Sequence, residues 1–236
     1  MRQTSERPQG RKGTLTVLPS VMSAAALIFG VSACGGNDES TEEPTLTASQ
    51  VCDSTLDSSA TSALKRMGNT EKFTELPGTM NSGEPSKFSL KRSAKTIYED
   101  MTQRNQCVVF KAGDKTGHPL MTVDFSAVNY HPRADDASQD EKSENVIYPI
   151  GLYAKTNGNA SAAIYFKCSA QASGTAKESE PYIKASLTSA PGQVSVKSTG
   201  QDLVTVLNAV SRAMAEQLDC ASEAALPTQV PKPTTG

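Results

Sequence analysis

The sequence predicts an α+β fold, in which two N-terminal helices and one C-terminal helix pack on an antiparallel β-sheet. Apolar residues recur at helical spacing near both ends of residues 51–221, and several segments between them alternate apolar with polar residues. The Asn157-Gly158 dipeptide, which favours a tight hairpin turn, separates two of these segments. Short connections of this kind join antiparallel strands, so we expect a helical layer and a sheet in one α/β sandwich.

Three segments carry helix signals. Asp57, Ser86 or Ser89, and Thr199 are in positions to cap a helix, and Asp202 falls favourably in the first turn of the last one. We expect the first helix to end at Gly68. The apolar stripes in chain order are Ala60, Leu64 and Met67; Leu90, Ala94, Ile97, Tyr98 and Met101; and Leu203, Leu207, Val210, Met214 and Leu218.

Six segments carry strand signals. The clearest is 120–128, where Met121, Val123 and Phe125 alternate with polar residues. Pro149 and Gly151 interrupt one of the segments, which indicates an edge strand or a bulge there. The expected strands are 72–76, 107–112, 120–128, 146–155, 162–170 and 182–188.

The chain divides into four parts by composition. Residues 1–33 resemble a secretory signal, 34–50 form an acidic polar tether, 51–221 form one domain, and 222–236 form a Pro- and Thr-rich tail expected to be disordered. A domain of that size buries roughly 70% of the surface of its unfolded chain, which is enough for a hydrophobic core. The flexible tether gives a root-mean-square reach of roughly 20–25 Å.

The N-terminal segment has the three parts of a signal peptide. Arg2, Arg7, Arg11 and Lys12 precede an uncharged, mostly apolar run at 15–30, and small residues follow it. The run is shorter than the roughly 20 residues of a membrane-spanning helix. An uncleaved N-terminal anchor is the alternative.

The end of this segment specifies where the chain is processed. The tetrapeptide Val31-Ser32-Ala33-Cys34 resembles the lipobox of bacterial lipoproteins, and the Cys-Gly-Gly start with its polar linker resembles small envelope lipoproteins of actinobacteria. The resemblance implies cleavage before Cys34 and a thioether-linked diacylglyceryl group on its thiol, with acyl chains such as palmitate. Two acyl chains anchor stably where one does not, so the expected location is the outer face of the cytoplasmic membrane. A secretory signal that merely contains a cysteine is the alternative.

Four further cysteines lie in the domain: Cys52, Cys107, Cys168 and Cys220. An even number in an exported domain predicts two disulfides, whereas their wide spacing argues against a metal site. Cys168 shares the apolar face of its strand, and Cys220 ends the helix expected to cover that face. Cys107 has the opposite parity to Val108 and Phe110, so we expect it to point elsewhere. We therefore predict the pairs Cys168–Cys220 and Cys52–Cys107.

Charge argues against a nucleic-acid partner. Residues 1–33 carry four basic residues and one acid, so the rest of the chain has a net charge of −5, against −2 for the whole. The tether supplies most of it through Asp38, Glu39, Glu42 and Glu43. The folded part is close to neutral and shows no basic patch.

The sequence contains no complete set of catalytic motifs. Ser62-x-x-Lys65, Ser143-x-Asn145 and Lys115-Thr116-Gly117 match short motifs of penicillin-binding enzymes, but the last two occur in the wrong order. His118 and His131 each precede a proline and read as turn residues, and no Gly-x-Ser-x-Gly motif accompanies them. The acidic stretch 132–145 lacks the spacing and glycine of a calcium loop.

Two function classes remain. We expect a membrane-anchored, non-enzymatic binding module of the cell envelope, with an envelope protein or a small ligand as its partner and no cofactor or metal. The alternative is an envelope enzyme or enzyme accessory with a site that short motifs do not reveal. A cavity lined by convergent side chains would favour small-ligand binding.

Overall fold

The computed structural model describes residues 45–79, 83, 85–98, 105–133, 145–169 and 182–234. Cys34, the signal segment, most of the tether and the acidic stretch 134–144 therefore lie outside the described residues. Within them no helix is long and apolar enough to cross a bilayer.

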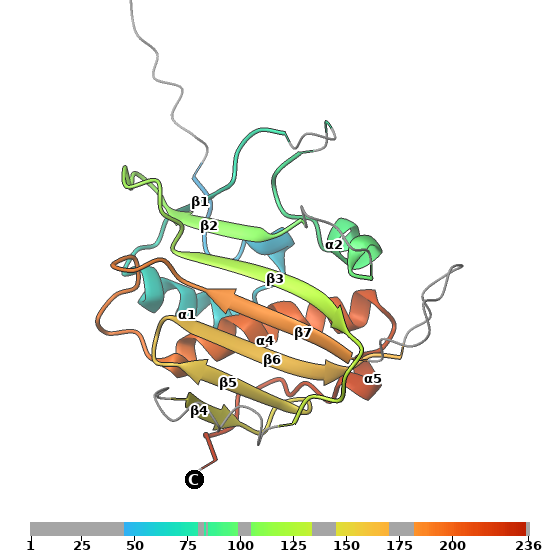
Figure 1. Ribbon diagram of the computed structural model, residues 1–236. Coiled ribbons are helices and arrows are strands. Elements are labelled where there is room, and N and C mark those ends of the chain that lie inside the picture. The colour runs from blue at the N-terminus through green and yellow to red at the C-terminus, as the bar shows by residue number, and fades with distance from the viewer. Residues whose placement is uncertain are drawn as a thin grey trace, which may run out of the picture. The chain divides into compact units, whose positions relative to one another are not determined.

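The fold is a seven-stranded antiparallel sheet with helices, which confirms the expected α+β class (Figure 1). The strand order is β1-β2-β3-β7-β6-β5-β4, and every neighbouring pair is antiparallel. In chain order the elements are η1 (Cys52–Ser54), α1 (Ser58–Gly68), β1 (Phe73–Glu75), α2 (Leu90–Thr96), β2 (Cys107–Lys111), β3 (Met121–Val128), β4 (Asn145–Tyr148), β5 (Tyr153–Asn157), β6 (Ser161–Lys167), β7 (Tyr182–Thr188), α4 (Gly200–Gln217) and α5 (Ala221–Ala224).

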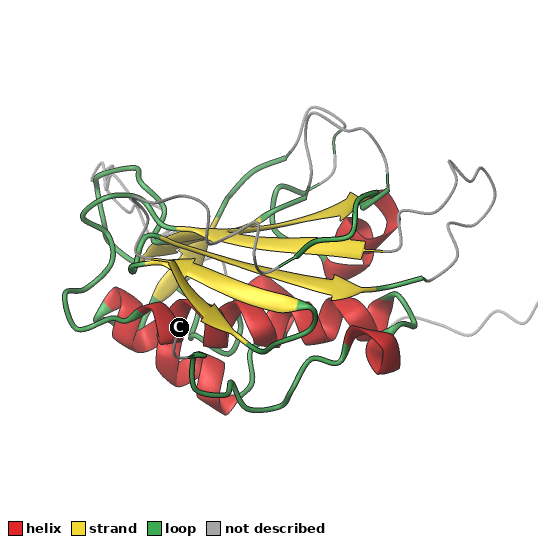
Figure 2. Cartoon of the chain, turned by 60° about the horizontal axis from the view of Figure 1, so that its bottom comes forward, coloured by secondary structure: helices red, strands yellow, loops and turns green. Residues whose placement is uncertain are grey.

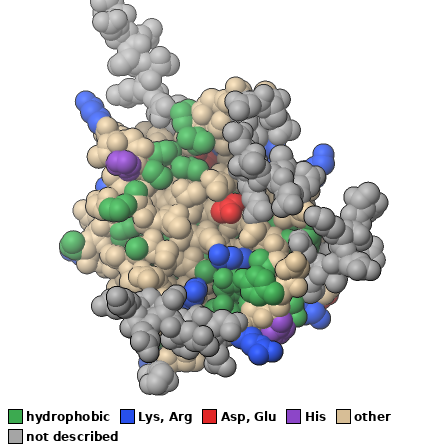
Figure 3. Space-filling view, viewed as in Figure 1, with side chains coloured by type: hydrophobic (Ala, Val, Ile, Leu, Met, Phe, Trp, Pro, Cys, Tyr) green, Lys and Arg blue, Asp and Glu red, His purple; other side chains and the backbone are tan. Residues whose placement is uncertain are grey.

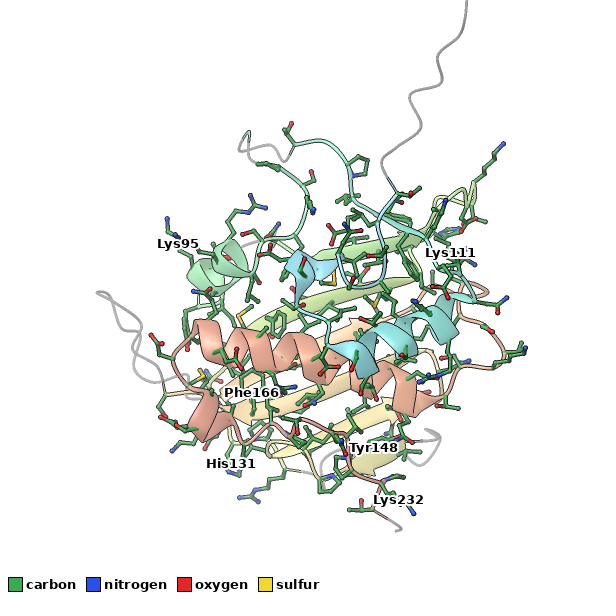
Figure 4. All side chains as sticks on the ribbon, turned by 180° about the vertical axis from the view of Figure 1, so that it is seen from behind. Lys95, Lys111, His131, Tyr148, Phe166 and Lys232 are labelled. Atoms are coloured by element: carbon green, nitrogen blue, oxygen red, sulfur yellow. A yellow bond between two sulfur atoms is a disulfide. The ribbon has the colours of Figure 1, made fainter. Side chains whose placement is uncertain are left out.

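The helix α4 lies across one face of the sheet, and α1 packs beside it (Figures 2 and 4). Leu203, Leu207 and Val210 of α4 are fully buried, as are Ile164 and Phe166 of β6 below them. Buried residues of the same parity on the other strands complete this core, because alternate side chains of a strand share one face. The sheet is thus covered by helices on one side.

Local signals set the starts of the two main helices. Asp57 caps α1 by accepting a hydrogen bond from the Ala60 N–H at 3.0 Å, as expected. Thr199 and Asp202 form a capping box at the start of α4. The helix α1 includes Gly68, and Asn69 takes the left-handed cap position that was expected of the glycine.

The predicted strand 146–155 is two strands, β4 and β5, which pair with each other. Pro149 has no N–H for a ladder, and Gly151 adopts a left-handed φ of +60°. These residues reverse the chain instead of producing a bulge. The Asn157-Gly158 hairpin between β5 and β6 is confirmed.

Both ends of the domain differ from the expectation. Leu46, placed in the tether, exchanges two backbone hydrogen bonds with Phe73, and Ala48 is fully buried. The tail, expected to be disordered from residue 222, contains α5 and an ordered segment as far as residue 234. Leu226 and Val230 pack on the core, and Thr234 donates to the Ile147 carbonyl on β4. A few apolar anchors therefore order segments that look polar overall.

The structure contains the two expected disulfides, Cys52–Cys107 and Cys168–Cys220, with Cα–Cα distances of 5.3 and 5.2 Å. The expectation that Cys107 points away from the helix-covered face was wrong. Cys107 lies on the helix-covered face together with Val109, and both are fully buried, while Val108 points to the other face. The short strand β2 carries apolar residues on both faces, so parity alone could not assign its core side.

Two glycines with left-handed backbones make a matched test of packing. A Cβ at Gly151 would lie 2.6 Å from the Tyr165 carbonyl oxygen, whereas a Cβ at Gly158 would meet nothing within 4 Å. We expect Gly158→Ala to cost about 1 kcal/mol of unfolding free energy, from the backbone conformation alone. Gly151→Ala should cost about 2 kcal/mol more, because strand backbone must move. Urea unfolding measures both, and equal losses would contradict this packing.

Candidate functional site

A polar groove opens on the helical side of the molecule, between the start of α1, the first half of α4 and the C-terminal segment. Its volume is about 470 Å³, within the usual range of small-ligand sites. Figure 4 shows α1 and α4 side by side and the C-terminal segment running past them toward Tyr148. The lining residues of this α1–α4 groove are Asp57, Ser58, Ser59, Ser62, Arg66, Gln201, Thr205, Asn208, Thr228, Gln229 and Val230.

The first two turns of α1 and α4 supply most of the groove's hydroxyl groups, and Thr228 of the C-terminal segment supplies another. Ser62 donates to the Ser58 carbonyl at 2.9 Å, and Thr205 donates to the Gln201 carbonyl at 2.7 Å. Each hydroxyl hydrogen is thereby directed at its own helix. The oxygen lone pairs that remain are acceptors, so these two side chains offer acceptors to the groove.

The two charged side chains of the groove are already paired. Asp57 accepts the Ala60 N–H with one carboxylate oxygen and Arg212 with the other, at 3.2 Å. Arg66 donates twice to Asp202 Oδ1, at 3.0 and 2.7 Å. The remaining lining side chains are hydroxyls, amides and one valine, so the groove presents neutral polar chemistry.

Asn208 is the buried polar residue of the groove, at 2% exposure. Its Nδ2 donates to the Pro227 carbonyl at 2.8 Å and so fastens the C-terminal segment to α4. Its Oδ1 is enclosed and has no hydrogen-bond partner. A buried carbonyl without a donor costs roughly 1–3 kcal/mol of stability.

The face of the sheet opposite the helices, which Figure 3 shows, carries a second cluster of polar and aromatic residues. Tyr153 and Tyr165 stack there with ring centroids 4.8 Å apart, and the Lys184 ammonium lies 6.0 Å from the Tyr165 centroid. Both rings are only 5% exposed. Burial, with repulsion from Tyr153 and Tyr130, raises the pKa of the Tyr165 hydroxyl. These tyrosines form a small packed cluster of their own rather than a flat platform for a ligand.

Glu75 forms the third cluster, beside the Cys52–Cys107 disulfide. Its Oε1 accepts the Cys52 N–H at 2.5 Å and lies 3.7 Å from Cys107 Sγ. Lys87 Nζ lies 3.8 Å from the other oxygen. Burial raises the pKa of the Glu75 carboxyl, against the lowering effects of the Cys52 N–H and Lys87. Both sulfurs are spent in the disulfide, so this cluster holds no thiolate that could ligate a metal.

The structure does not assemble the penicillin-binding motif. Ser62 lies in the groove, but Lys65 pairs with Glu71 at 2.5 Å. Lys115-Thr116-Gly117 forms the turn between β2 and β3, where the Thr116 hydroxyl bonds to Asp114 and Gln193. Ser143 lies outside the described residues, and Asn145 begins β4.

The two histidines are exposed, as turn residues usually are. His118 lies in the turn between β2 and β3, and its N–H donates to the Thr116 hydroxyl. His131 contacts Tyr182 edge-to-face, with ring centroids 5.1 Å apart. Neither histidine lines the α1–α4 groove.

Sequence reasoning missed the groove and Glu75. The groove combines three segments that are distant in the chain, and its residues are ordinary polar surface types that carry no motif. Glu75 is a single acid in a three-residue strand. The one available signal was its position two residues after Phe73, which places both on the same strand face.

No protein-family model matches the chain, and searches of curated proteins and of solved structures found no match either. Function is therefore inferred from the chain's own residues and their geometry.

The raised pKa of Glu75 predicts how the stability of the protein depends on pH. A group whose pKa is higher in the folded state favours folding at low pH, and that contribution is lost as the pH rises through the folded pKa. Glu75→Gln keeps the acceptor for the Cys52 N–H but cannot ionise. We expect the variant to gain stability relative to the wild type between about pH 4 and pH 7, measured by urea unfolding.

Glu223→Gln is the control of opposite sign. Hydrogen bonds from Ser169, together with Lys167, lower the pKa of the Glu223 carboxyl. This variant should lose stability relative to the wild type as the pH rises from the lowered folded pKa of Glu223 to the ordinary carboxyl pKa, and so below about pH 5. A Glu75→Gln variant that also lost stability as the pH rose would show that Glu75 is stabilised as an anion.

Proposed function

We propose that the protein is a lipid-anchored, non-enzymatic binding module of the cell envelope that holds a small polar ligand in the α1–α4 groove. The tetrapeptide Val31-Ser32-Ala33-Cys34, the apolar run before it and the polar segment after it support the anchor. Two disulfides support an oxidising compartment outside the cytoplasm.

The groove's lack of reactive groups is the observation that carries this function. The described residues of its lining include no His, Cys, Lys, Glu or Tyr, and both oxygens of the one carboxylate among them accept hydrogen bonds from within the protein. General acid–base or nucleophilic chemistry needs a proton carrier or nucleophile that is free to act. A site with many hydrogen-bonding groups and no such residue is suited to hold a ligand without transforming it.

The folded domain starts close to the anchor. Leu46 is already paired with Phe73, so only about a dozen residues separate Cys34 from the folded domain. A chain of that length has a root-mean-square reach of about 20 Å. On this proposal the tether keeps the domain near the membrane surface, where ligands of the envelope are encountered.

The anchor is tested by Cys34→Ala. Without a thiol there is no acceptor for the lipid, so we expect the variant to leave the membrane fraction and to lack the acyl mass. Ser32→Ala is the matched control, because it keeps a small residue at its position and should remain membrane-bound. Intact-mass analysis and membrane fractionation measure both. A wild-type protein that carries no acyl group on Cys34, or that retains residues 1–33, would refute the anchor.

The binding role is tested with a library of small polar fragments. We expect ligand-observed NMR to detect fragments that bind the full-length product purified in detergent. Ser62→Trp, at an exposed groove position, should abolish these signals by filling the site. Gln217→Trp, at the exposed far end of α4, is the control and should leave them intact. If no fragment binds, or if Ser62→Trp has no effect, the groove is not a ligand site.

A further inference from the structure

We propose that the ligand of the α1–α4 groove is an uncharged saccharide. This inference rests on the proposed binding function and assigns the chemical class of ligand for the same site. It follows from how the groove's hydrogen-bonding groups are already used.

The state of the charges argues against an ionic ligand. The groove's carboxylate and guanidinium are each bonded within the protein, to Arg212 and Asp202 respectively. An ionic ligand would lose hydration on entering and would find no unpaired counter-charge in the lining. Phosphates, carboxylates and amines are therefore disfavoured, and a neutral ligand avoids that cost.

The acceptor geometry argues for a ligand with hydroxyl groups. Ser62 and Thr205 direct their hydrogens at backbone carbonyls, so toward the groove they can only accept. The exposed amides of Gln201 and Gln229 can both donate and accept. A sugar hydroxyl donates one hydrogen bond and accepts others, which matches a mixed set of this kind.

Asn208 fixes one wall of the site. It lines the groove at 2% exposure, its amide nitrogen is occupied by the Pro227 carbonyl, and its Oδ1 has no donor. The oxygen is enclosed, so Asn208 serves the site through the hydrogen bond that holds the C-terminal segment against α4.

The scarcity of apolar lining argues against lipids and apolar peptides. Among the described residues that line the groove, Val230 is the one with an apolar side chain. A lipid chain or a hydrophobic peptide anchor would bury little apolar surface against it, and apolar burial is what drives such binding. A short saccharide can bind mainly through hydrogen bonds and bridging waters instead.

Three sugars of the same ring size test the charge argument. N-acetylglucosamine is neutral, glucosamine is cationic and glucose 6-phosphate is anionic. In calorimetric titrations of the full-length product in detergent, run with a panel of neutral mono- and disaccharides, we expect neutral sugars to bind at least about 10-fold more tightly than the charged ones. Equal or tighter binding of either charged sugar would overturn the proposal.

Two substitutions locate the binding. Thr205→Val removes a groove hydroxyl with little change in shape and should weaken the sugar about 3- to 10-fold, whereas Thr205→Ser should retain wild-type affinity. Asn208→Leu removes the bond that holds the C-terminal wall of the groove and should weaken sugar binding at least as much, and unfolding curves must show that this variant is folded. Unchanged affinity in Thr205→Val would place the sugar elsewhere and overturn the proposal.

The fragment experiment distinguishes failure of the saccharide assignment from failure of the proposed binding function. If fragments bind and Ser62→Trp displaces them, but no neutral sugar of the panel binds, the saccharide assignment is wrong while the binding function stands. If neither fragments nor sugars bind, both are wrong.

Discussion

The burial of α4 is the constraint on which the rest of the structure depends. One side of this helix packs on the sheet, and the other contacts α1 and the C-terminal segment, so that most of its residues are buried. Apolar residues suffice toward the sheet. The helix therefore needs partners for its polar side as well, and Arg66 of α1 and Pro227 of the C-terminal segment provide them by bonding Asp202 and Asn208.

The groove is a consequence of this arrangement. Two separate elements cover the polar side of α4, and they do not close over its first half. The gap between them is lined by surface side chains of both elements, most of which carry hydroxyl or amide groups. The ion pairs that fasten α1 to α4, Arg66–Asp202 and Arg212–Asp57, also use up the groove's charges. The same contacts that hold the helices together thus give the site its neutral character.

Residues with strong local signals made most of the fold predictable. Asp57, Thr199 and the alternating pattern of 120–128 act within a few residues, and the structure follows them. Other features depend on contacts between distant segments. These are the side of the sheet on which Cys107 lies, the ordered conformation of the tail, and the groove. Residues such as Val230 and Asn208 look ordinary in sequence, because their roles come only from what packs against them. Composition could therefore describe the tail as polar but could not show that it is anchored.

A neutral ligand also suits a domain tethered beside a membrane. On the proposed function, charged headgroups and the four acids of the tether would create an electrostatic potential that is screened over about 8 Å at physiological ionic strength and changes with salt. Whenever the domain approaches the membrane to within that distance, the potential would alter the local concentration of an ionic ligand but leave that of an uncharged sugar nearly unchanged. On the proposed function, the internal pairing of Asp57 and Arg66 does more than stabilise the helices. It makes binding depend on hydrogen-bond geometry and not on the electrostatic conditions at the membrane surface.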